Sequence, residues 1–438
     1  MKLFHTFAKY VTFNVLGMLA LSCYILADTF FIAQGLGADG LTSLNLAIPV
    51  YSFINGCGLM VGIGGSTRYS IFKASGKDSE ASQIFTHSLI LGAVIAFLFV
   101  FIGCFFTQEL TLFLGADEMV FDMTFIYLKI MLFFSPAFIL NNIMNAFVRN
   151  DGNPGLAMTA MISGSLANIL FDYILIFPCG LGMKGAILAT GFSPLFGLLI
   201  LSRHFASDVD GLSNIRIVRV TPSLSNTLDI CALGVSSLIA EVASGVVIII
   251  FNLIILDLSG NIGVAAYSII ANLSLVVTAI FTGIAQGLQP IFSQAHGNGL
   301  LENIRSLFKY GIILSLALSV LIYLLFIIES EPIISVFNEN NNPTLARIAE
   351  DGLQLYFIAF VFAGVNIISA TLLSSTDNPH QAFLLSSLRG FVIIIPCIIG
   401  MALLWDMTGV WMSFPVAEGL TMLITLWIIC GYFSEGTG

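Results

Sequence analysis

Asn168 and Asp172 stand one helical turn apart in an otherwise apolar stretch, LANILFDYILIF, at positions 166–177. A spacing of four residues places both side chains on one face of a helix. An amide and a carboxylate arranged in this way can bind a cation or hold a proton where the surroundings exclude water. The composition of the whole chain indicates what those surroundings are.

The composition indicates that most of the protein surface faces lipid. Of the 438 residues, 58% are hydrophobic and only 9% are charged, whereas an ordinary soluble domain carries about 25% charged residues. Many apolar runs reach the roughly 18 residues with which a helix crosses a bilayer, and the short alternation of a membrane β-barrel is not seen. The sequence therefore predicts an all-α integral membrane protein.

Twelve membrane-spanning helices are predicted. They are placed at residues 11–33, 44–67, 84–106, 123–145, 156–178, 184–202, 228–256, 264–292, 307–328, 351–375, 386–404 and 410–432. The first apolar segment is too long for a signal peptide and carries Asp28, so it is interpreted as a retained helix. An even number of crossings puts both termini on the same side of the membrane.

The basic residues predict which side that is. With the N-terminus inside, all Lys and Arg residues except Lys129, Lys184 and Arg347 fall on cytoplasmic segments. Such an asymmetry follows the positive-inside rule and predicts a multi-pass protein of the cytoplasmic (inner) membrane with both termini in the cytoplasm. Much of the acidic excess behind the net charge of −10 lies on outer loops, so no nucleic-acid partner is expected.

Faint internal similarity predicts two pseudo-symmetric lobes of six helices each. Residues 62–77 resemble 283–298 at an offset of 221, NPGLA (153–157) resembles NPHQA (378–382) at 225, and MKG (183–185) resembles MTG (407–409) at 224. The predicted lobes comprise residues 1–202 and 228–438, and a polar cytoplasmic linker, 203–227, joins them. Six helices per lobe make the repeat parallel, which is one of the two plans of secondary transporters.

Four acidic residues fall within the predicted spans: Asp28, Asp172, Glu241 and Glu418. An ionisable group inside a membrane costs several kcal/mol unless it has a partner or faces water. No basic residue is predicted to lie deep enough to neutralise them, since Lys129 and Arg389 are placed near helix ends. These acids are therefore expected to be protonated, to bind a cation or to face water.

Asp28 and Asp172 lie in the outer halves of their helices in the same lobe, so they could meet at one depth. With Asn168 and the hydroxyl of Thr190 on the next helix, they would form an all-oxygen site. Such a site suits a hard cation such as Na⁺, with Asp28 and Asp172 as its ligands, or a shared proton; no other metal and no cofactor are predicted. The alternative is that Asp172 only hydrogen-bonds to a neighbouring helix.

Polar stripes on the predicted helices indicate a water-lined cavity. Glu241 is accompanied by Ser237 on the seventh helix, and the eighth helix carries Asn272 and Gln286. Together with Asn366 on the tenth helix, these polar residues are predicted to line the cavity, and Glu241 is a second candidate acidic site. Hydrogen bonding between helices is the alternative for each neutral residue.

Other chemistry finds no support in the motifs. The sequence contains no P-loop, which argues against an ATP-driven pump, and no HExxH or GxSxG motif, so no enzyme activity is predicted. The seven cysteines are scattered and none form a CxxC pair. A membrane-embedded enzyme or a receptor remains a remote alternative.

Several stretches resemble the multidrug and toxic compound extrusion (MATE) family. They are ADTFFIAQGLGADGL (27–41), VRNDGNP (148–154), NILFDYILIF (168–177), GMKGAILAT (182–190) and TGVWMSFPVAEGL (408–420). The resemblance covers nearly the whole chain in the right order. It implies twelve helices in two lobes and the export of organic cations in exchange for H⁺ or Na⁺.

The resemblance also assigns expected roles to single residues. The family's N-lobe cation site corresponds to Asp28, Asn168, Asp172 and Thr190, and a tyrosine that accompanies it corresponds to Tyr127. Glu241 corresponds to a seventh-helix acid of the drug-exporting bacterial branch. Two departures stand out: Gly364 stands about where a C-lobe cation site would carry an acid, and the first helix lacks the kinking proline of some relatives.

The sequence thus predicts secondary active multidrug efflux by a monomeric antiporter for small organic cations. An exporter or flippase of lipid-linked or polysaccharide precursors from the same superfamily is the alternative. It would be expected to carry a basic central cavity, whereas the predicted interior of this chain is acidic.

Overall fold

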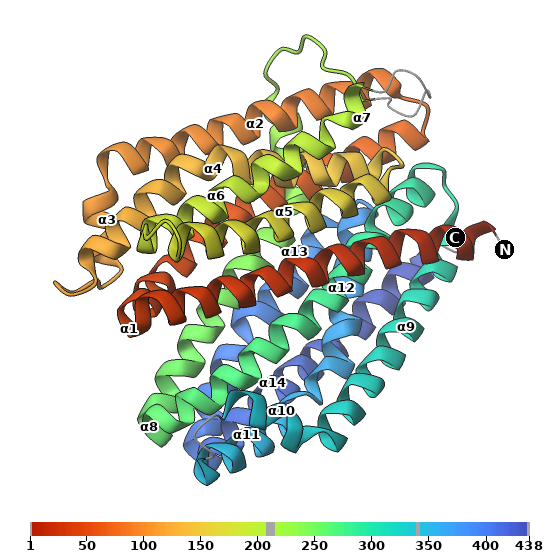
Figure 1. Cartoon of the computed structure of the whole chain (residues 1–438). Coiled ribbons are helices and arrows are strands. Elements are labelled where there is room, and N and C mark those ends of the chain that lie inside the picture. Colours follow the sequence, from red (N-terminus) through yellow and green to blue (C-terminus); the bar gives the residue numbers. More distant parts are fainter. Residues whose placement is uncertain (1, 207–214, 339–341, 436–438) are drawn as a thin grey trace.

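The computed structural model describes residues 2–206, 215–338 and 342–435, and this described part is helical, without a β-strand (Figure 1). Residues 207–214 of the predicted linker lie outside the described residues. The elements are α1 (Lys2–Ala74), α2 (Asp78–Phe105), α3 (Thr107–Phe113), α4 (Phe121–Asn150), α5 (Pro154–Ile176), α6 (Gly182–Leu201), α7 (Arg203–Ala206), α8 (Leu224–Gly297), α9 (Leu301–Ile328), α10 (Ser330–Phe337), α11 (Pro343–Tyr356), α12 (Ala359–Ser375), α13 (Pro379–Ser387), the π-helical turn η1 (Leu388–Val392) and α14 (Ile394–Glu435).

Twelve membrane crossings arise from nine helical segments of the described chain. Eight segments are long and apolar enough to span a membrane, and the bent pair α11–α12 makes the ninth. Three of these segments contain a break at which the chain turns back: α1 at Gly37, α8 at Gly260, and the segment Pro379–Ser434, formed by α13, η1 and α14, at Trp405–Asp406. Each of these three therefore crosses twice, which confirms the predicted twelve-helix architecture.

The tenth span differs from its prediction. The sequence predicts one helix over residues 351–375, whereas the structure has α11 and α12 with a bend of 46° between them. The polar sequence of α11 explains the difference, because it begins at Pro343 with an Asn342 side chain that caps two backbone N–H groups. The helix thus starts eight residues earlier and changes direction where the apolar run begins.

The two lobes have residues in the left-handed backbone conformation at matching positions. Matching pairs are Gly37 (φ 65°) with Gly260 (φ 60°), Gly152 (φ 96°) with Asp377 (φ 62°), and Gly182 (φ 56°) with Asp406 (φ 49°). Their offsets are 223, 225 and 224 residues. The agreement supports the parallel repeat and fixes its register helix by helix.

One predicted register is wrong. Gly76 (φ 74°) and Gly299 (φ 69°) both end a helix in the left-handed conformation, as glycines after helix ends commonly do. They are 223 residues apart, not 221. The match of 62–77 with 283–298 is therefore displaced by two residues, because small residues recur in both stretches and align by chance.

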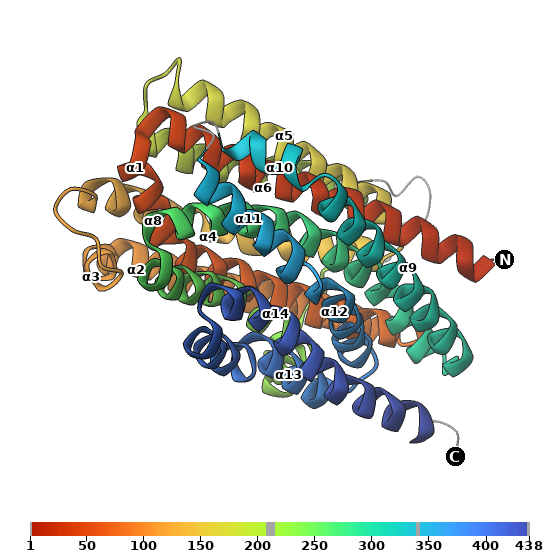
Figure 2. The ribbon, with the colours of Figure 1, turned by 90° about the horizontal axis from the view of Figure 1, so that it is seen from below.

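The two lobes meet along α1 and α8, and both termini lie at one end of the molecule (Figures 1 and 2). We call this end the termini end. Close backbone packing holds the lobes together there: a Cβ atom on Gly64 would lie 2.0 Å from the Ile230 carbonyl oxygen, and one on Gly234 would lie 1.9 Å from that of Met60. Only glycine permits such an approach.

Polar contacts between the lobes also lie at the termini end. Arg149 on α4 donates to Oε1 of Gln286 at 2.8 Å, and Asn150 donates to Oε1 of Gln289 at 2.9 Å. A third contact is an ion-pair network in which Arg68 bridges Asp229 at 2.5 Å and Asp377 at 2.7 Å. These contacts close the termini end between the lobes.

Candidate functional site: a carboxylate cluster beside a polar cavity

Four helices of the N-terminal lobe bring the five predicted cation-site residues together. Asp28 comes from α1, Tyr127 from α4, Asn168 and Asp172 from α5, and Thr190 from α6. All five are buried, with exposed fractions of 7% for Asp28 and 0% for both Asn168 and Asp172. The cluster thus gathers residues that are up to 162 positions apart in the sequence.

The hydrogen bonds of the cluster centre on Asp172. The carboxyl groups of Asp28 and Asp172 lie within hydrogen-bonding reach of each other. With its amide oriented so that both terminal atoms have partners, Asn168 donates to Oδ2 of Asp172 at 2.9 Å and accepts from the backbone N–H of Thr190 at 3.3 Å. The Tyr127 hydroxyl lies beside that of Thr190, next to the two acids.

Asn168 lies where the sequence predicts, between Asp172 and Thr190. One terminal atom of its amide is 2.9 Å from Oδ2 of Asp172, and the other is 3.3 Å from the backbone nitrogen of Thr190. The amide is thus placed to orient Asp172, and its role as a cation ligand stays a prediction.

Each carboxyl group retains one oxygen without a donor. Oδ1 of Asp28 and Oδ1 of Asp172 are buried and have no hydrogen-bond partner among the described residues. An unsatisfied buried carboxylate oxygen is costly. A proton on one carboxyl group, or a small hard cation between the two, would satisfy both oxygens. The donor set fits either ligand because it consists of oxygen atoms.

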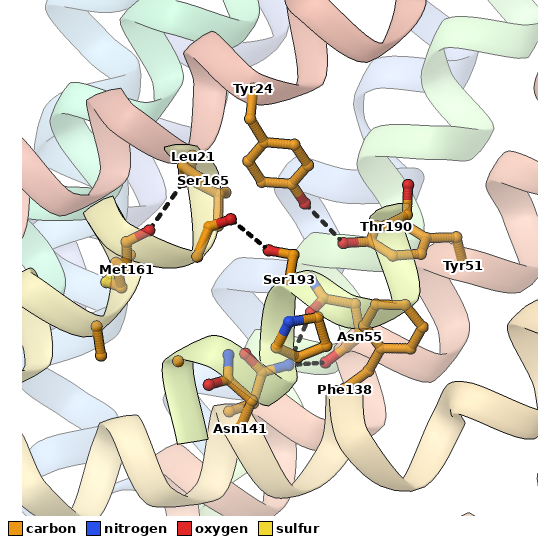
Figure 3. A pocket seen from close by; sticks show the side chains of 15 residues that line it. Leu21, Tyr24, Tyr51, Asn55, Phe138, Asn141, Met161, Ser165, Thr190 and Ser193 are labelled. Carbon is orange, nitrogen blue, oxygen red and sulfur yellow. Dashed lines mark hydrogen bonds between the residues drawn. The ribbon is translucent and has the colours of Figure 1, made fainter. Parts of the chain in front are cut away.

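A polar cavity of about 60 Å³ adjoins the cluster (Figure 3). Its lining includes Thr190 of the cluster, and on other sides aromatic, amide and hydroxyl side chains: Tyr24, Tyr51, Asn55, Phe138, Asn141, Asn142, Ser165 and Ser193. Tyr24 and Tyr51 are hydrogen-bonded through their hydroxyl groups at 3.2 Å. The cavity can therefore present both aromatic faces and hydrogen-bonding groups to a small molecule.

Glu241 lies next to this cavity, where the lobes meet, because it is bonded to the lining residue Asn55. Asn55 donates to its Oε1 at 2.9 Å, and Asn142 donates to Oδ1 of Asn55 at 2.7 Å. An acid of the C-terminal lobe is thereby tied to two amides of the N-terminal lobe. The cavity wall connects this acid to the cluster through Asn55 and Thr190.

The other predicted cavity-lining residues lie elsewhere. Gln286 is engaged with Arg149 at the termini end, and Asn366 is 2% exposed and bonded to Glu418 inside the C-terminal lobe. Ser237 and Asn272 are half-buried on α8. None of these four residues lines the cavity beside the cluster.

The prediction that no basic residue lies deep in a span is wrong for Arg389. Its helix begins at Pro379 rather than at residue 386, so Arg389 lies nearly three turns into the membrane segment. Its Nε atom forms an ion pair of 2.5 Å with Oε1 of Glu418, which is 2% exposed. Glu418 is therefore neutralised by a partner that the sequence places at a helix end.

The carboxylate cluster is not repeated among the described residues of the C-terminal lobe. At the repeat offsets, Asp28 corresponds to Phe251 and Thr190 corresponds to Phe414. Both phenylalanines belong to an aromatic group around Tyr356, with ring centroids 6.1 Å and 4.5 Å away. At Gly364, a Cβ atom would lie 1.9 Å from the Ser315 hydroxyl, so the position leaves no room for an acidic side chain.

This two-lobed helical fold, with acids and a polar cavity inside the membrane-spanning region, defines a polytopic membrane protein of a transporter type. The MatE family model matches residues 15–174 and 237–399. The chain therefore belongs to the MatE family.

Individual relatives agree with this family assignment. The chain is 24% identical over 417 residues to the multidrug export protein MepA of Staphylococcus saprophyticus, covering 95% of the chain and 91% of the relative. It is 23% identical over 419 residues to MepA of Staphylococcus aureus, with the same coverage.

Solved structures share the fold. One is a multidrug resistance MATE family transporter of the MOP superfamily in an outward-facing conformation, with a TM-score of 0.93, 19% identity, and coverage of 99% of this chain and 96% of that one. Another is a variant of the MATE transporter VcmN from Vibrio cholerae, with a TM-score of 0.91, 19% identity, and coverage of 99% and 98%.

Proposed function

We propose that the protein is a multidrug efflux transporter that exports small organic cations in exchange for H⁺ or Na⁺. The observation that carries this proposal is the buried pair Asp28–Asp172, in which each carboxyl group has one oxygen without a donor. The names of the staphylococcal relatives support the efflux direction and a broad range of compounds. A monomer in the inner membrane is part of the proposal.

The proposed orientation places the termini end in the cytoplasm. It rests on the asymmetry of the basic residues along the sequence. Because the contacts between the lobes close the termini end, the structure would then represent a state that is open to the outside. Arg149, Arg68 and their partners would have to separate before a substrate could enter from the cytoplasm.

In the proposed cycle, a cation enters from outside and satisfies the free oxygens of Asp28 and Asp172. Substrate binds at the cavity beside Thr190 once the lobes have moved to widen it, because drug-sized ligands occupy roughly 300–1,000 Å³. Tyr24 and Tyr51 then contact its flat apolar part. Glu241 supplies a negative charge next to that cavity. Coupling requires only that cation and substrate favour different arrangements of the lobes.

Purified protein in liposomes that contain a fluorescent organic cation tests this function. A Na⁺ gradient and a pH gradient are imposed separately, for the wild type and for Asp172→Asn. We expect one gradient to drive dye movement in the wild type and neither to do so in the variant. Equal dye movement in both proteins would contradict the proposal, and dye movement without any gradient would show a facilitator rather than an antiporter.

A further inference from the structure

The Arg389–Glu418 ion pair belongs to a hydrogen-bonded polar group inside the C-terminal lobe. Asn366 on α12 donates from Nδ2 to Oε2 of Glu418 at 2.8 Å, and its own Oδ1 accepts from the hydroxyl of Thr425 at 2.8 Å. Asn366, Glu418 and Thr425 are at most 2% exposed, whereas 24% of the Arg389 side chain is exposed. The buried Glu418 carboxylate, oriented by Asn366 and through it by Thr425, thus binds the guanidinium of Arg389, which reaches in from a more open position.

The internal repeat shows which residues of the N-terminal lobe correspond to the Arg389–Glu418 group. At the offset of 225, Asn366 corresponds to Asn141 and Arg389 corresponds to Gly164; at the offset of 224, Glu418 corresponds to Pro194. Asn141, Gly164 and Pro194 all line the polar cavity of the N-terminal lobe. The space that is open in one lobe is therefore filled by an ion pair in the other.

A local change of helix geometry directs the guanidinium of Arg389 toward Glu418. Arg389 lies in η1, a single π-helical turn over Leu388–Val392. A π-turn adds one residue to a helical turn and rotates the following side chains, and such turns recur at functional sites. A Cβ atom on the neighbouring Gly390 would lie 2.6 Å from Cβ of Ala243, two residues from Glu241, so η1 packs directly against the helix that carries this acid.

We propose that Glu418, oriented by Asn366 and Thr425, forms an organic-cation site in the C-terminal lobe, which Arg389 occupies as a tethered guanidinium. The ligands of this site are small monovalent cations that offer an N–H donor to Oε1 of Glu418, namely guanidinium and amidinium groups. Both Glu418 oxygens already accept N–H groups in this geometry, from Arg389 and Asn366. Quaternary ammonium ions lack such donors and do not fit.

The tethered cation makes the two lobes unequal. A buried carboxylate without a cation is strongly destabilising, and a tether gives Arg389 a high effective concentration at Glu418. Free cations therefore compete poorly at this site in the wild type, and the open cavity of the N-terminal lobe is left as the place for substrate. Arg389 therefore keeps free cations from binding at Glu418.

Chemical rescue of Arg389→Ala tests the inference. The thermal stability of the purified full-length protein in detergent is measured with and without ethylguanidinium, a mimic of the removed side chain. We expect the variant to melt lower than the wild type, and millimolar ethylguanidinium to raise its melting temperature by on the order of 2–4 °C. The wild type and Arg389→Lys, which keep a cation at the site, are expected to respond several-fold less.

Two controls identify the carboxylate and the ligand class. The double variant Arg389→Ala/Glu418→Gln has no buried charge to satisfy, so ethylguanidinium should not stabilise it, and tetramethylammonium should stabilise neither variant. If Arg389→Ala fails to accumulate, Arg389→Gln takes its place, and accumulation only in the presence of ethylguanidinium supports the site. Equal stabilisation of the single and double variants, or none in either Arg389 variant, overturns the proposal.

Discussion

Asn55 on α1 donates a hydrogen bond of 2.9 Å to Oε1 of Glu241 on α8, and this bond joins the two lobes beside the polar cavity. The two residues are 186 positions apart. Asn142 holds Asn55 in place from α4 with a further bond of 2.7 Å. Any motion that separates the lobes must therefore break a bond to the acid that we assign to the substrate.

The role of the Glu241 charge can be separated from that of its hydrogen bond. Glu241→Gln keeps an oxygen acceptor for Asn55 but has no charge, so we expect a normal fold and export of organic cations lowered roughly tenfold, the effect of about 1.4 kcal/mol. Glu241→Leu also leaves the Asn55 amide without its acceptor and should lose a further 1–3 kcal/mol or so of stability. Dye export and melting temperature are measured on both variants. Unchanged export by Glu241→Gln would restrict Glu241 to a structural role.

The Arg68 network should favour the state that is closed at the termini end. Arg68→Gln removes the bridge between Asp229 and Asp377, so we expect the population of that state to fall roughly fivefold, equivalent to about 1 kcal/mol. Spin labels at the exposed positions 77 and 298, in a background without native cysteines, report the distance between the lobes. Arg305→Gln serves as the control because its partners, Glu302 and the Phe433 carbonyl, lie in the same lobe. The same distance distribution in both variants would rule out a gating role for Arg68.

The close approach of the lobes at Gly234 predicts a second substitution that disfavours the state closed at the termini end. A Cβ atom there would lie 1.9 Å from a backbone oxygen of Met60, which cannot move aside like a flexible side chain. Gly234→Ala should therefore destabilise the closed termini end by about 1–3 kcal/mol and shift the same label distances to longer values. Gly400→Ala is the matched control, since a Cβ atom there meets nothing within 4 Å. A shift in both alanine variants would show that the effect is not steric.

Asp151, in the turn between α4 and α5, predicts a pH dependence of stability. Burial by itself raises the pKa of its carboxyl group, but hydrogen bonds from His204, Lys73 and Tyr69 outweigh burial and hold the pKa below its usual value. A lowered pKa means that the ionised form stabilises the fold above the unfolded pKa of about 4, and that this stabilisation is lost as the pH falls through the folded pKa.

Melting temperatures measured between pH 3 and pH 7 test whether Asp151 loses its stabilising effect as the pH falls. We expect Asp151→Asn to be less stable than the wild type at pH 7 and to lose less stability on acidification. Asp122→Asn, at an exposed residue of α4, is the control and should follow the wild-type curve. Parallel curves for Asp151→Asn and the wild type would show that the carboxyl group contributes no pH dependence.

The sequence predicts the cluster well because its signals are local. Asn168 and Asp172 share a helix face by their spacing alone, and polar residues are conspicuous in an apolar segment. Tyr24 lies four residues before Asp28 and could have been found by the same spacing rule. The long apolar runs likewise predict the helices, although not the bend between α11 and α12.

Contacts between distant segments lie beyond such reasoning. Nothing in the spacing of Asn55 and Glu241 indicates that they bond to each other, because the contact depends on how the lobes pack. Arg389 illustrates the same point: a helix start misplaced by seven residues moved it from the membrane interior to a helix end. The π-turn η1, which directs Arg389 toward Glu418, has no signature in its sequence LRGFV.

The central claim is that cation binding at Asp28 and Asp172 opposes substrate binding. The most direct measurement is the affinity of the purified protein for a fluorescent organic cation, at several Na⁺ concentrations and pH values, for the wild type and for Asp28→Asn/Asp172→Asn. The account predicts that wild-type affinity falls about 5–150-fold as the coupling cation saturates, and that the double variant has one affinity throughout. Wild-type affinity that is independent of both ions, or the same dependence in the double variant, would contradict it.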